Sequence, residues 1–231
     1  MRLRSTLMLL SVLVLGVSAI PVQASDCSIS RTERQTLLQL PFNQFDQQSG
    51  NGWRPLYAEK CYLEAATLLQ DYMKRHPDAA REHYMLPFHT GQMFALAGKY
   101  PEAIKWMEKG YSDDRSDLID WNAFANANIA FLKHDYAGLL MQRSLIDKEP
   151  PMPEQRGVPD WAVGKKMNLD VVDGFIACFD KTYEVAYGNE CRNEGKEWAS
   201  KSSRRKRLRV RGGGAVSRPP PGNSFQPTPL R

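Results

Sequence analysis

The sequence has few of the residues that build metal or redox centres. Its 231 residues include only four cysteines and four histidines, and no two cysteines have the close C-x-x-C spacing of zinc sites. His83 and His89 are six residues apart, so they would face different directions on a helix. H-E-x-x-H, G-x-S-x-G and P-loop patterns are absent. The sequence therefore predicts no metal, no cofactor and no catalytic residue, and an enzyme with an unrecognised site is kept as an alternative.

Long hydrophobic runs are confined to the N-terminus. Arg2 and Arg4 precede an apolar run from Leu7 to Ile20, which is shorter than the ~20 residues that span a membrane. The following V-Q-A is a small-x-small cleavage site, so residues 1–24 are expected to be a signal peptide. An uncleaved N-terminal anchor is the alternative. We expect an exported protein, periplasmic or secreted, with no transmembrane span in the mature chain.

Export changes how the cysteines are interpreted, because an oxidising compartment favours disulfide bonds. Proximity in sequence favours Cys27–Cys61 and Cys178–Cys191 among the three possible connectivities. On one unbroken helix the last two would lie ~20 Å apart, whereas a disulfide requires ~6 Å between Cα atoms. The chain must therefore reverse near Gly188 for the second bond to form.

Acidic residues are absent from residues 201–231, which hold nine Arg or Lys. These nine residues and the two arginines of the signal peptide carry more positive charge than the total formal charge of +5. The rest of the chain therefore carries a net negative charge. The Gly/Pro-rich tail over 200–231 cannot bury a core and is expected to be disordered. It either binds anionic lipid or an anionic polymer, or is a solubilising extension. Nucleic acid is a poor candidate partner for an exported protein. The candidate residues for anionic-surface binding are Arg204, Arg205, Lys206, Arg207, Arg209 and Arg211.

Helical periodicity predicts an all-α domain over residues 25–199. Ser30 opens a capping box before an apolar turn. Residues 41–53 and 149–159 are rich in turn-forming residues and are expected to be loops. The expected helices cover residues 30–40, 55–75, 117–132, 135–146 and 172–186, in addition to a central pair.

The central pair lies between His89 and Gly110, with a turn at Gly98. Pro87 indicates that its first helix begins near Met85 or is kinked there. This stretch resembles a tetratricopeptide repeat (TPR). That pattern has a small residue and an aromatic residue on its first helix, then a Gly-x-Tyr-x-x-Ala turn, and then a large apolar residue on its second helix. The residues that carry the resemblance are Gly91, Phe94, Gly98, Tyr100, Ala103 and Met107.

Weaker echoes of the same pattern flank the central pair. Ala65, Ala103 and Leu139 occupy matching positions, 38 and 36 residues apart, against the usual repeat of ~34 residues. The resemblance implies a short TPR-like array over about 57–151, closed by a C-terminal capping helix. An ordinary irregular helical bundle is the alternative. The other matching residues are Tyr62, Leu69 and Pro77 upstream, and Ala127, Ala130, Tyr136 and Pro151 downstream.

The resemblance implies a concave face, lined by the first helix of each pair, that binds a protein or peptide partner in the cell envelope. In TPR proteins an Asn in the place of Asn128 often contacts the bound peptide. Basic clamp residues beside it are not evident, so recognition of a C-terminal carboxylate is not expected. The aromatic residues could instead be core packing, or be covered by the chain's own termini. A tethering protein that acts through its basic tail is the other candidate function. The predicted peptide-binding residues are Phe88, His89, Gln92, Trp121, Phe124 and Asn128.

Overall fold

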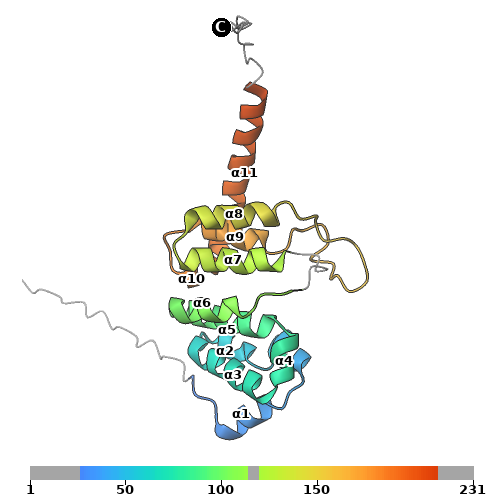
Figure 1. Ribbon diagram of the computed structural model, residues 1–231, viewed down its shortest axis with the longest axis vertical. Helices are drawn as coiled ribbons and strands as arrows, with labels where there is room; N and C mark the ends of the chain where they lie inside the picture. Colours follow the sequence, from blue (N-terminus) through green and yellow to red (C-terminus); the bar gives the residue numbers. More distant parts are fainter. Residues whose placement is uncertain (1–26, 114–119, 213–231) are drawn as a thin grey trace, which may run out of the picture.

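The computed structural model describes residues 27–113 and 120–212, and all regular structure in these two ranges is helical (Figure 1). The predicted all-α class is confirmed. The expected signal peptide over 1–24 and the last part of the tail lie outside the described residues. The helices are α1 (Arg31–Leu37), a π-helical turn (Asn43–Gln47), α2 (Arg54–Ala58), α3 (Tyr62–Arg75), α4 (Pro77–Glu82), α5 (Met85–Leu96), α6 (Tyr100–Glu108), α7 (Trp121–Leu132), α8 (Tyr136–Ile146), α9 (Leu169–Ala177), α10 (Tyr183–Tyr187) and α11 (Asn189–Gly212).

Three turns of the chain share one backbone geometry. They join α2 to α3, α5 to α6 and α7 to α8, and their central residues take positive φ: Lys60 at 60°, Gly98 at 72° and His134 at 57°. In each turn, the residue that follows the positive-φ residue donates its backbone N–H to the carbonyl of the residue five positions before it, at 2.7, 2.8 and 2.8 Å. A tyrosine then begins the second helix of each pair. The three helix pairs are therefore connected in the same way.

The central and following pairs also agree in register. Gly91 and Ala127 are each the seventh residue of their helix, and both are buried. A Cβ on Gly91 would lie 2.8 Å from the backbone oxygen of Ala103 in α6, so only glycine permits this approach of α5 to α6. Ala65, Ala103 and Leu139, at matching places in the second helices, are fully buried. The fourth residue of the second helix is thus buried in all three pairs, and the seventh residue of the first helix is buried in two of them.

Four sequence expectations require correction. The expected helix over 55–75 is broken by the positive φ of Lys60, so α2 and α3 are separate helices. The expected loop over 41–53 contains the π-helical turn Asn43–Gln47. The expected helix over 172–186 is divided into α9 and α10. Residues 200–212, expected to be disordered, continue α11, because a sequence rich in Arg and Lys favours helix once its first half is packed.

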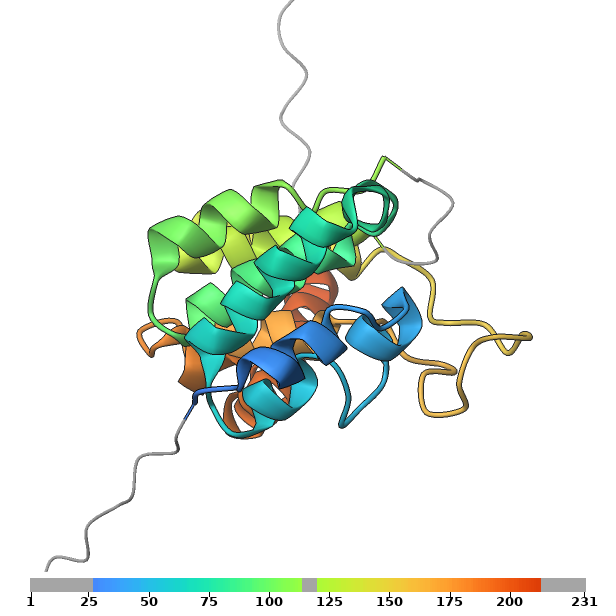
Figure 2. The ribbon, with the colours of Figure 1, turned by 90° about the horizontal axis from the view of Figure 1, so that it is seen from below.

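Other expectations are confirmed. The Ser30 side chain accepts a hydrogen bond from the Glu33 N–H at the start of α1. Helix α5 begins at Met85, so Pro87 lies in its first turn, where the N–H of a residue has no partner within the helix. Residues 147–168 form an irregular connection between α8 and α9, which extends away from the helices (Figure 2).

Helices α9 and α11 are held against each other in two ways. The Cys178–Cys191 disulfide joins the end of α9 to the beginning of α11. Four residues further along α11, a Cβ on Gly195 would come within 2.4 Å of the Asp173 carbonyl carbon, so this contact is backbone to backbone. The second half of α11 then leaves the body of the molecule (Figure 1).

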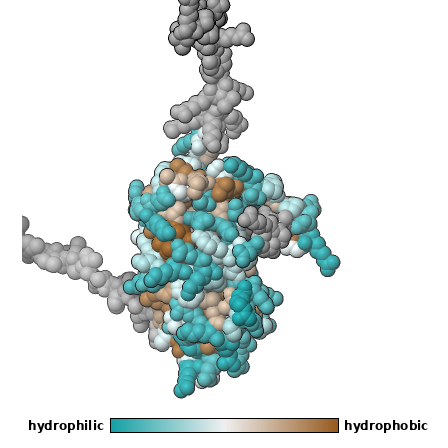
Figure 3. All heavy atoms as spheres, in the orientation of Figure 1, coloured by the Kyte–Doolittle hydropathy of each residue, from teal (hydrophilic) through white to brown (hydrophobic). Residues whose placement is uncertain are grey.

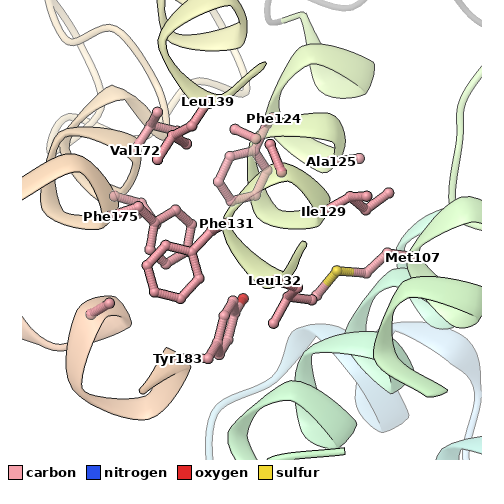
Figure 4. Close-up of a cluster of buried hydrophobic side chains, with 14 of the residues drawn as sticks. Met107, Phe124, Ala125, Ile129, Phe131, Leu132, Leu139, Val172, Phe175 and Tyr183 are labelled. Carbon is pink, nitrogen blue, oxygen red and sulfur yellow. The ribbon is translucent and has the colours of Figure 1, made fainter. Parts of the chain in front are cut away.

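The interior is divided into two hydrophobic clusters. One lies around α3 and contains Phe45, Trp53 and Tyr72. The other is built from residues of helices α5 to α11 and includes the stacked rings of Phe131 and Phe175 (Figure 4). Burial of such rings contributes roughly 1.5–3 kcal/mol each. The two clusters meet at α5, which has buried residues on all sides and supports the candidate site.

Candidate functional site

Four of the six predicted peptide-binding residues lie in the core. Phe88, Trp121, Phe124 and Asn128 are at most 8% exposed and line no cavity described below; Gln92 is also only 8% exposed, but it borders a cavity. The Phe88 ring lies 4.8 Å from Trp121 and 5.5 Å from Phe124, and the Trp121 indole N–H donates to the Gly110 carbonyl at 2.7 Å. These side chains stabilise the contact between α5 and α7, and they offer no surface to a ligand in this structure. Their position agrees with the alternative of core packing.

Asn128 is covered by the chain's own helix α10. The Tyr183 hydroxyl donates to Asn128 Oδ1 at 2.6 Å, and both side chains are fully buried. The backbone N–H of Tyr183 donates to the Tyr100 hydroxyl at 3.1 Å. Figure 4 shows the Tyr183 ring pointing into the interior beside Phe131. The place where the resemblance expects a bound peptide is therefore occupied by a residue of the same chain.

The remaining two predicted residues, His89 and Gln92, line a cavity of about 120 Å³ between α2, α5 and α10. We call it the α2–α5–α10 cavity. Its wall combines aromatic rings with polar groups, and the rings of Trp53 and His89 are 5.3 Å apart. The Trp53–Tyr57 stretch was not predicted to belong to a site. Besides His89 and Gln92, the residues important for the site are Trp53, Arg54, Tyr57, Tyr183 and Tyr187.

A buried carboxylate holds this wall in place. Asp46 is fully buried, and its Oδ1 accepts hydrogen bonds from Trp53 Nε1 at 2.9 Å and from His89 Nδ1 at 2.8 Å. The Gln47 side-chain amide donates to Oδ2. Because a carboxylate can only accept, the hydrogen of the His89 ring lies on Nδ1 in this contact. Asp46 thus fixes the orientation of two rings that line the cavity.

The pKa of the Asp46 carboxyl reflects two opposing effects. Burial would raise this pKa, but the hydrogen bond and electrostatic interaction with His89, the hydrogen bond from Trp53 and the charge of Arg54 outweigh burial and lower it. The group is therefore a carboxylate at neutral pH. Its role at this position is to accept hydrogen bonds from the surrounding donors.

Arg54 brings a positive charge to the cavity wall. Its Nε donates to the backbone carbonyl of Asp46 at 2.7 Å, and its guanidinium lies 4.6 Å from the centre of the Trp53 ring. Within the described ranges, no carboxylate oxygen lies within 4.0 Å of its side-chain nitrogens. The side chain is half-buried, so the charge is fixed in position and still accessible.

An Asp–His pair lies at the wall of this cavity, beside its aromatic rings. An Asp–His pair such as Asp46–His89 can orient an imidazole for proton transfer. The residues that line the cavity include no Ser, Thr, Cys or Lys that could act as a nucleophile beside it. Among the described residues, no three His, Cys, Asp or Glu side chains are grouped closely enough to hold a metal ion. Rings, hydrogen-bonding groups and one cation are what the cavity offers to a ligand.

A second, larger hollow of about 320 Å³ lies between α3, α4, α5 and α6. Its floor is apolar and includes Met73, Pro87 and Trp106. Lys74 and Lys109 lie at its edge, and the Lys109 ammonium is 4.1 Å from the centre of the Trp106 ring. On the face of the molecule in Figure 3, hydrophobic residues form small separate patches on a mainly hydrophilic surface.

The predicted disulfides are confirmed, with Cα atoms 5.3 Å apart in Cys27–Cys61 and 5.8 Å apart in Cys178–Cys191. No described helix combines the length and the apolar character required to cross a membrane. Of the predicted anionic-surface residues, Arg204 is exposed on α11. The other five belong to the same helix, which runs on to Gly212: Arg205, Lys206, Arg207, Arg209 and Arg211.

In comparisons with known proteins, no family model, no curated protein and no solved structure matches this chain.

Proposed function

We propose that this chain is an exported, non-enzymatic, TPR-like protein that binds a segment of another protein in the cell envelope. The repeated connection of α2–α3, α5–α6 and α7–α8 supports the TPR-like part of the proposal. The two disulfides support export, because such bonds persist in oxidising compartments.

The observation that carries the binding proposal is the α2–α5–α10 cavity. Two of the first helices of the pairs, α2 and α5, contribute its wall, as expected for the ligand-binding face of such an array. The rings of Trp53, Tyr57 and Tyr187 supply apolar surface, while His89 and Gln92 supply hydrogen-bonding groups. Since Asp46 already orients Trp53 and His89, a ligand would not have to order them on binding.

Helix α10 limits what can bind. It covers Asn128 through Tyr183, so the ligand would contact α2 and α5 rather than extend along α7. The volume of about 120 Å³ is below the roughly 300–1,000 Å³ of sites for drug-sized molecules. The cavity therefore suits one or two residues of a partner, with the rest of the partner lying on the surrounding surface.

Site-specific photo-crosslinking in the native host tests this function. Tyr57, at the cavity, is 37% exposed, and Tyr136, at the start of α8, is 41% exposed. Each would be replaced by p-benzoylphenylalanine, and captured proteins would be identified by mass spectrometry. We expect one envelope protein to be captured from position 57 and not from position 136, and the purified partner to crosslink again in vitro. Identical capture from both positions, or none from position 57, would contradict the proposal.

The second candidate function is tethering to an anionic surface through α11. It is favoured by the course of this helix, which continues to Gly212 and leaves the body of the molecule (Figure 1). The test is sedimentation with vesicles containing phosphatidylglycerol, with phosphatidylcholine vesicles as the control. Truncation after Ala199 should abolish salt-sensitive binding, because it removes all the basic residues from Lys201 onwards. Undiminished binding by the truncated chain would reject the tether.

A further inference from the structure

We infer that the α2–α5–α10 cavity receives a carboxylate group of the partner segment and that Arg54 binds it. This inference rests on the proposed function, since it names the chemistry that the same site recognises. The starting observation is the environment of the Arg54 guanidinium, which lines the cavity without an acidic partner among the described residues.

Arg54 is held in a position suited to binding. One of its donors, Nε–H, is used by the Asp46 carbonyl at 2.7 Å. The Trp53 ring, 4.6 Å from the guanidinium carbon, supports the planar group from one side. The two terminal nitrogens have no hydrogen-bond partner in the described ranges. A guanidinium offers parallel N–H groups that match the two oxygens of a carboxylate.

The acidic groups near the cavity accept hydrogen bonds from side chains other than Arg54. Asp46 lies beneath the wall and accepts hydrogen bonds from Trp53 and His89. Glu184 pairs with Lys60 at 3.0 Å and accepts a hydrogen bond from the Tyr62 hydroxyl at 2.9 Å. These bonds lower the pKa of the Glu184 carboxyl. An incoming carboxylate therefore meets a guanidinium that has no carboxylate within 4.0 Å among the described residues, although the buried Asp46 carboxylate shares its field.

The other nearby arginine does not replace Arg54. Arg192 lies over the Tyr187 ring at 4.9 Å, but its Nε donates to the Tyr187 carbonyl and its Nη1 lies 3.5 Å from Asp170. Its charge is thus shared with an acid. It contributes a positive field near Tyr57: burial raises the pKa of the Tyr57 hydroxyl, and the charges of Arg192 and Arg54 oppose that rise. Of the two arginines, Arg54 is the one whose terminal nitrogens have no acidic partner among the described residues.

The carboxylate could come from the C-terminus of a partner or from an Asp or Glu side chain. Both present the same two oxygens to Arg54, and in both cases Trp53, Tyr57 and Tyr187 could pack on the adjoining carbons. Three small probes separate these sources. N-acetyl-leucine carries a terminal carboxylate, N-acetyl-glutamic acid α-amide carries only a side-chain carboxylate, and N-acetyl-leucine amide carries none.

The readout is the indole N–H resonance of Trp53 in the oxidised, full-length protein. This N–H donates to Asp46 inside the cavity wall, and it is assigned by comparison with Trp53→Phe. We expect at least one carboxylate probe to shift it saturably, with a Kd on the order of 1 mM, and the amide probe to leave it unchanged. Binding of only one carboxylate probe would identify the source, and binding of both would support the shared chemistry.

Arg54→Gln should weaken carboxylate binding by about 10-fold or more, because a charge-assisted pair is replaced by a neutral amide. Arg81→Gln is the matched control. Arg81 lies on α4, its side chain is 74% exposed, and it pairs with Asp78 away from the cavity. Arg54→Lys keeps the charge without the planar pair of donors and should bind with intermediate affinity.

Two results would overturn the inference: equal binding of the amide probe by the unsubstituted protein, or unchanged carboxylate affinity in folded Arg54→Gln. The probe comparison needs no Arg54 variant, so it decides the question even if Arg54→Gln does not fold. The crosslinking experiment distinguishes this failure from a failure of the proposed function. If a partner is captured from position 57 equally well with and without Arg54→Gln, only the carboxylate inference is rejected, and the protein-binding function stands. Binding of the probes without any captured partner would reject the protein-binding function.

Discussion

The hydroxyl of Tyr183 in α10 donates to Asn128 Oδ1 in α7 at 2.6 Å, in a position from which solvent is excluded. This contact joins two segments that are 55 residues apart. It places α10 over the region where the sequence suggested a peptide would lie. The Tyr183–Asn128 pair therefore covers the face of α7 at Asn128, and the α2–α5–α10 cavity remains as the place where a ligand could enter.

Replacing Tyr183 by Phe should destabilise the fold. The substitution keeps the ring but removes a hydrogen bond from a buried Asn oxygen, which costs about 1–3 kcal/mol. Denaturation by urea, followed by circular dichroism, measures the change. Tyr136→Phe is the control, because Tyr136 is 41% exposed and should change the free energy of unfolding by less than about 0.5 kcal/mol. Equal stabilities of the two variants would show that the Tyr183–Asn128 bond contributes nothing.

Gly91→Ala should be more damaging than its small size suggests. The added Cβ would lie 2.8 Å from the Ala103 carbonyl oxygen and 2.9 Å from the Met107 nitrogen, so α5 and α6 would have to separate. We expect a loss of about 3 kcal/mol in the free energy of unfolding.

Gly98→Ala is the comparison for Gly91→Ala. Gly98 has a φ of +72° but no atom within 4 Å of the added Cβ, so only backbone strain of about 1 kcal/mol applies. The same thermal or urea denaturation measures both variants. A Gly91→Ala protein as stable as Gly98→Ala would show that the close approach of α5 and α6 is not required.

Acid should weaken the fold partly through Asp46. Because its pKa in the folded protein is lowered from the ordinary 3.8, its contribution to stability is present above that pH. The contribution is lost as the pH falls through the lowered value. We expect the free energy of unfolding to decrease between about pH 5 and pH 2. Urea denaturation at a series of pH values provides the measurement.

Asp46→Asn separates this contribution from that of other acids. The variant should be less stable at neutral pH by about 1–3 kcal/mol, because it weakens the hydrogen bonds of Trp53 and His89. Its stability should also depend less steeply on pH below 4. Some dependence will persist, since the pKa values of Asp147 and Glu184 are lowered as well. A variant with the same acid slope as the unsubstituted protein would contradict the assignment to Asp46.

Loss of the Cys178–Cys191 disulfide should destabilise the C-terminal helices. Removing a cross-link across 13 residues with Cys178→Ala and Cys191→Ala should cost about 3 kcal/mol. Hydrogen exchange of amides in α9, α10 and α11 would increase more than that of amides in α3. The double variant of Cys27 and Cys61 is the complement, and its increased exchange should be concentrated around α1 and α2. Uniform increases in both variants would argue against local stabilisation.

The sequence was sufficient for the parts of the fold that depend on local signals. Gly98 indicated a turn, Ser30 indicated a helix start, and cysteine proximity indicated both disulfides. The break between α2 and α3 was missed because it depends on a positive φ at Lys60, a residue type that rarely adopts this conformation. The break between α9 and α10 was missed because it contains neither Gly nor Pro, although Thr182 does accept a hydrogen bond at the start of α10.

The candidate site was only partly predictable. His89 and Gln92 were named, but the contacts that organise the cavity connect Asp46 to His89, 43 residues away, and place Tyr187 beside α2. Such long-range contacts leave no periodic pattern in the sequence. One signal was present: a single Trp followed by Arg in an otherwise polar stretch. Trp121, Phe124 and Asn128 were assigned to a groove because the aligned pattern does not distinguish an open face from one closed by the contact of α5 with α7 and by Tyr183 of α10.

Helix α11 also sets the distance between the body of the molecule and the distal, basic end of this helix. Its 24 residues correspond to a rod of about 36 Å, and only its first half is held, by the Cys178–Cys191 disulfide and by the contacts of Gly195 and Trp198. A charged surface that attracted the distal residues would hold the helical body at a standoff of some 20 Å. At that spacing the docking of a partner near Arg54 and the attachment of the rod would be sterically independent events.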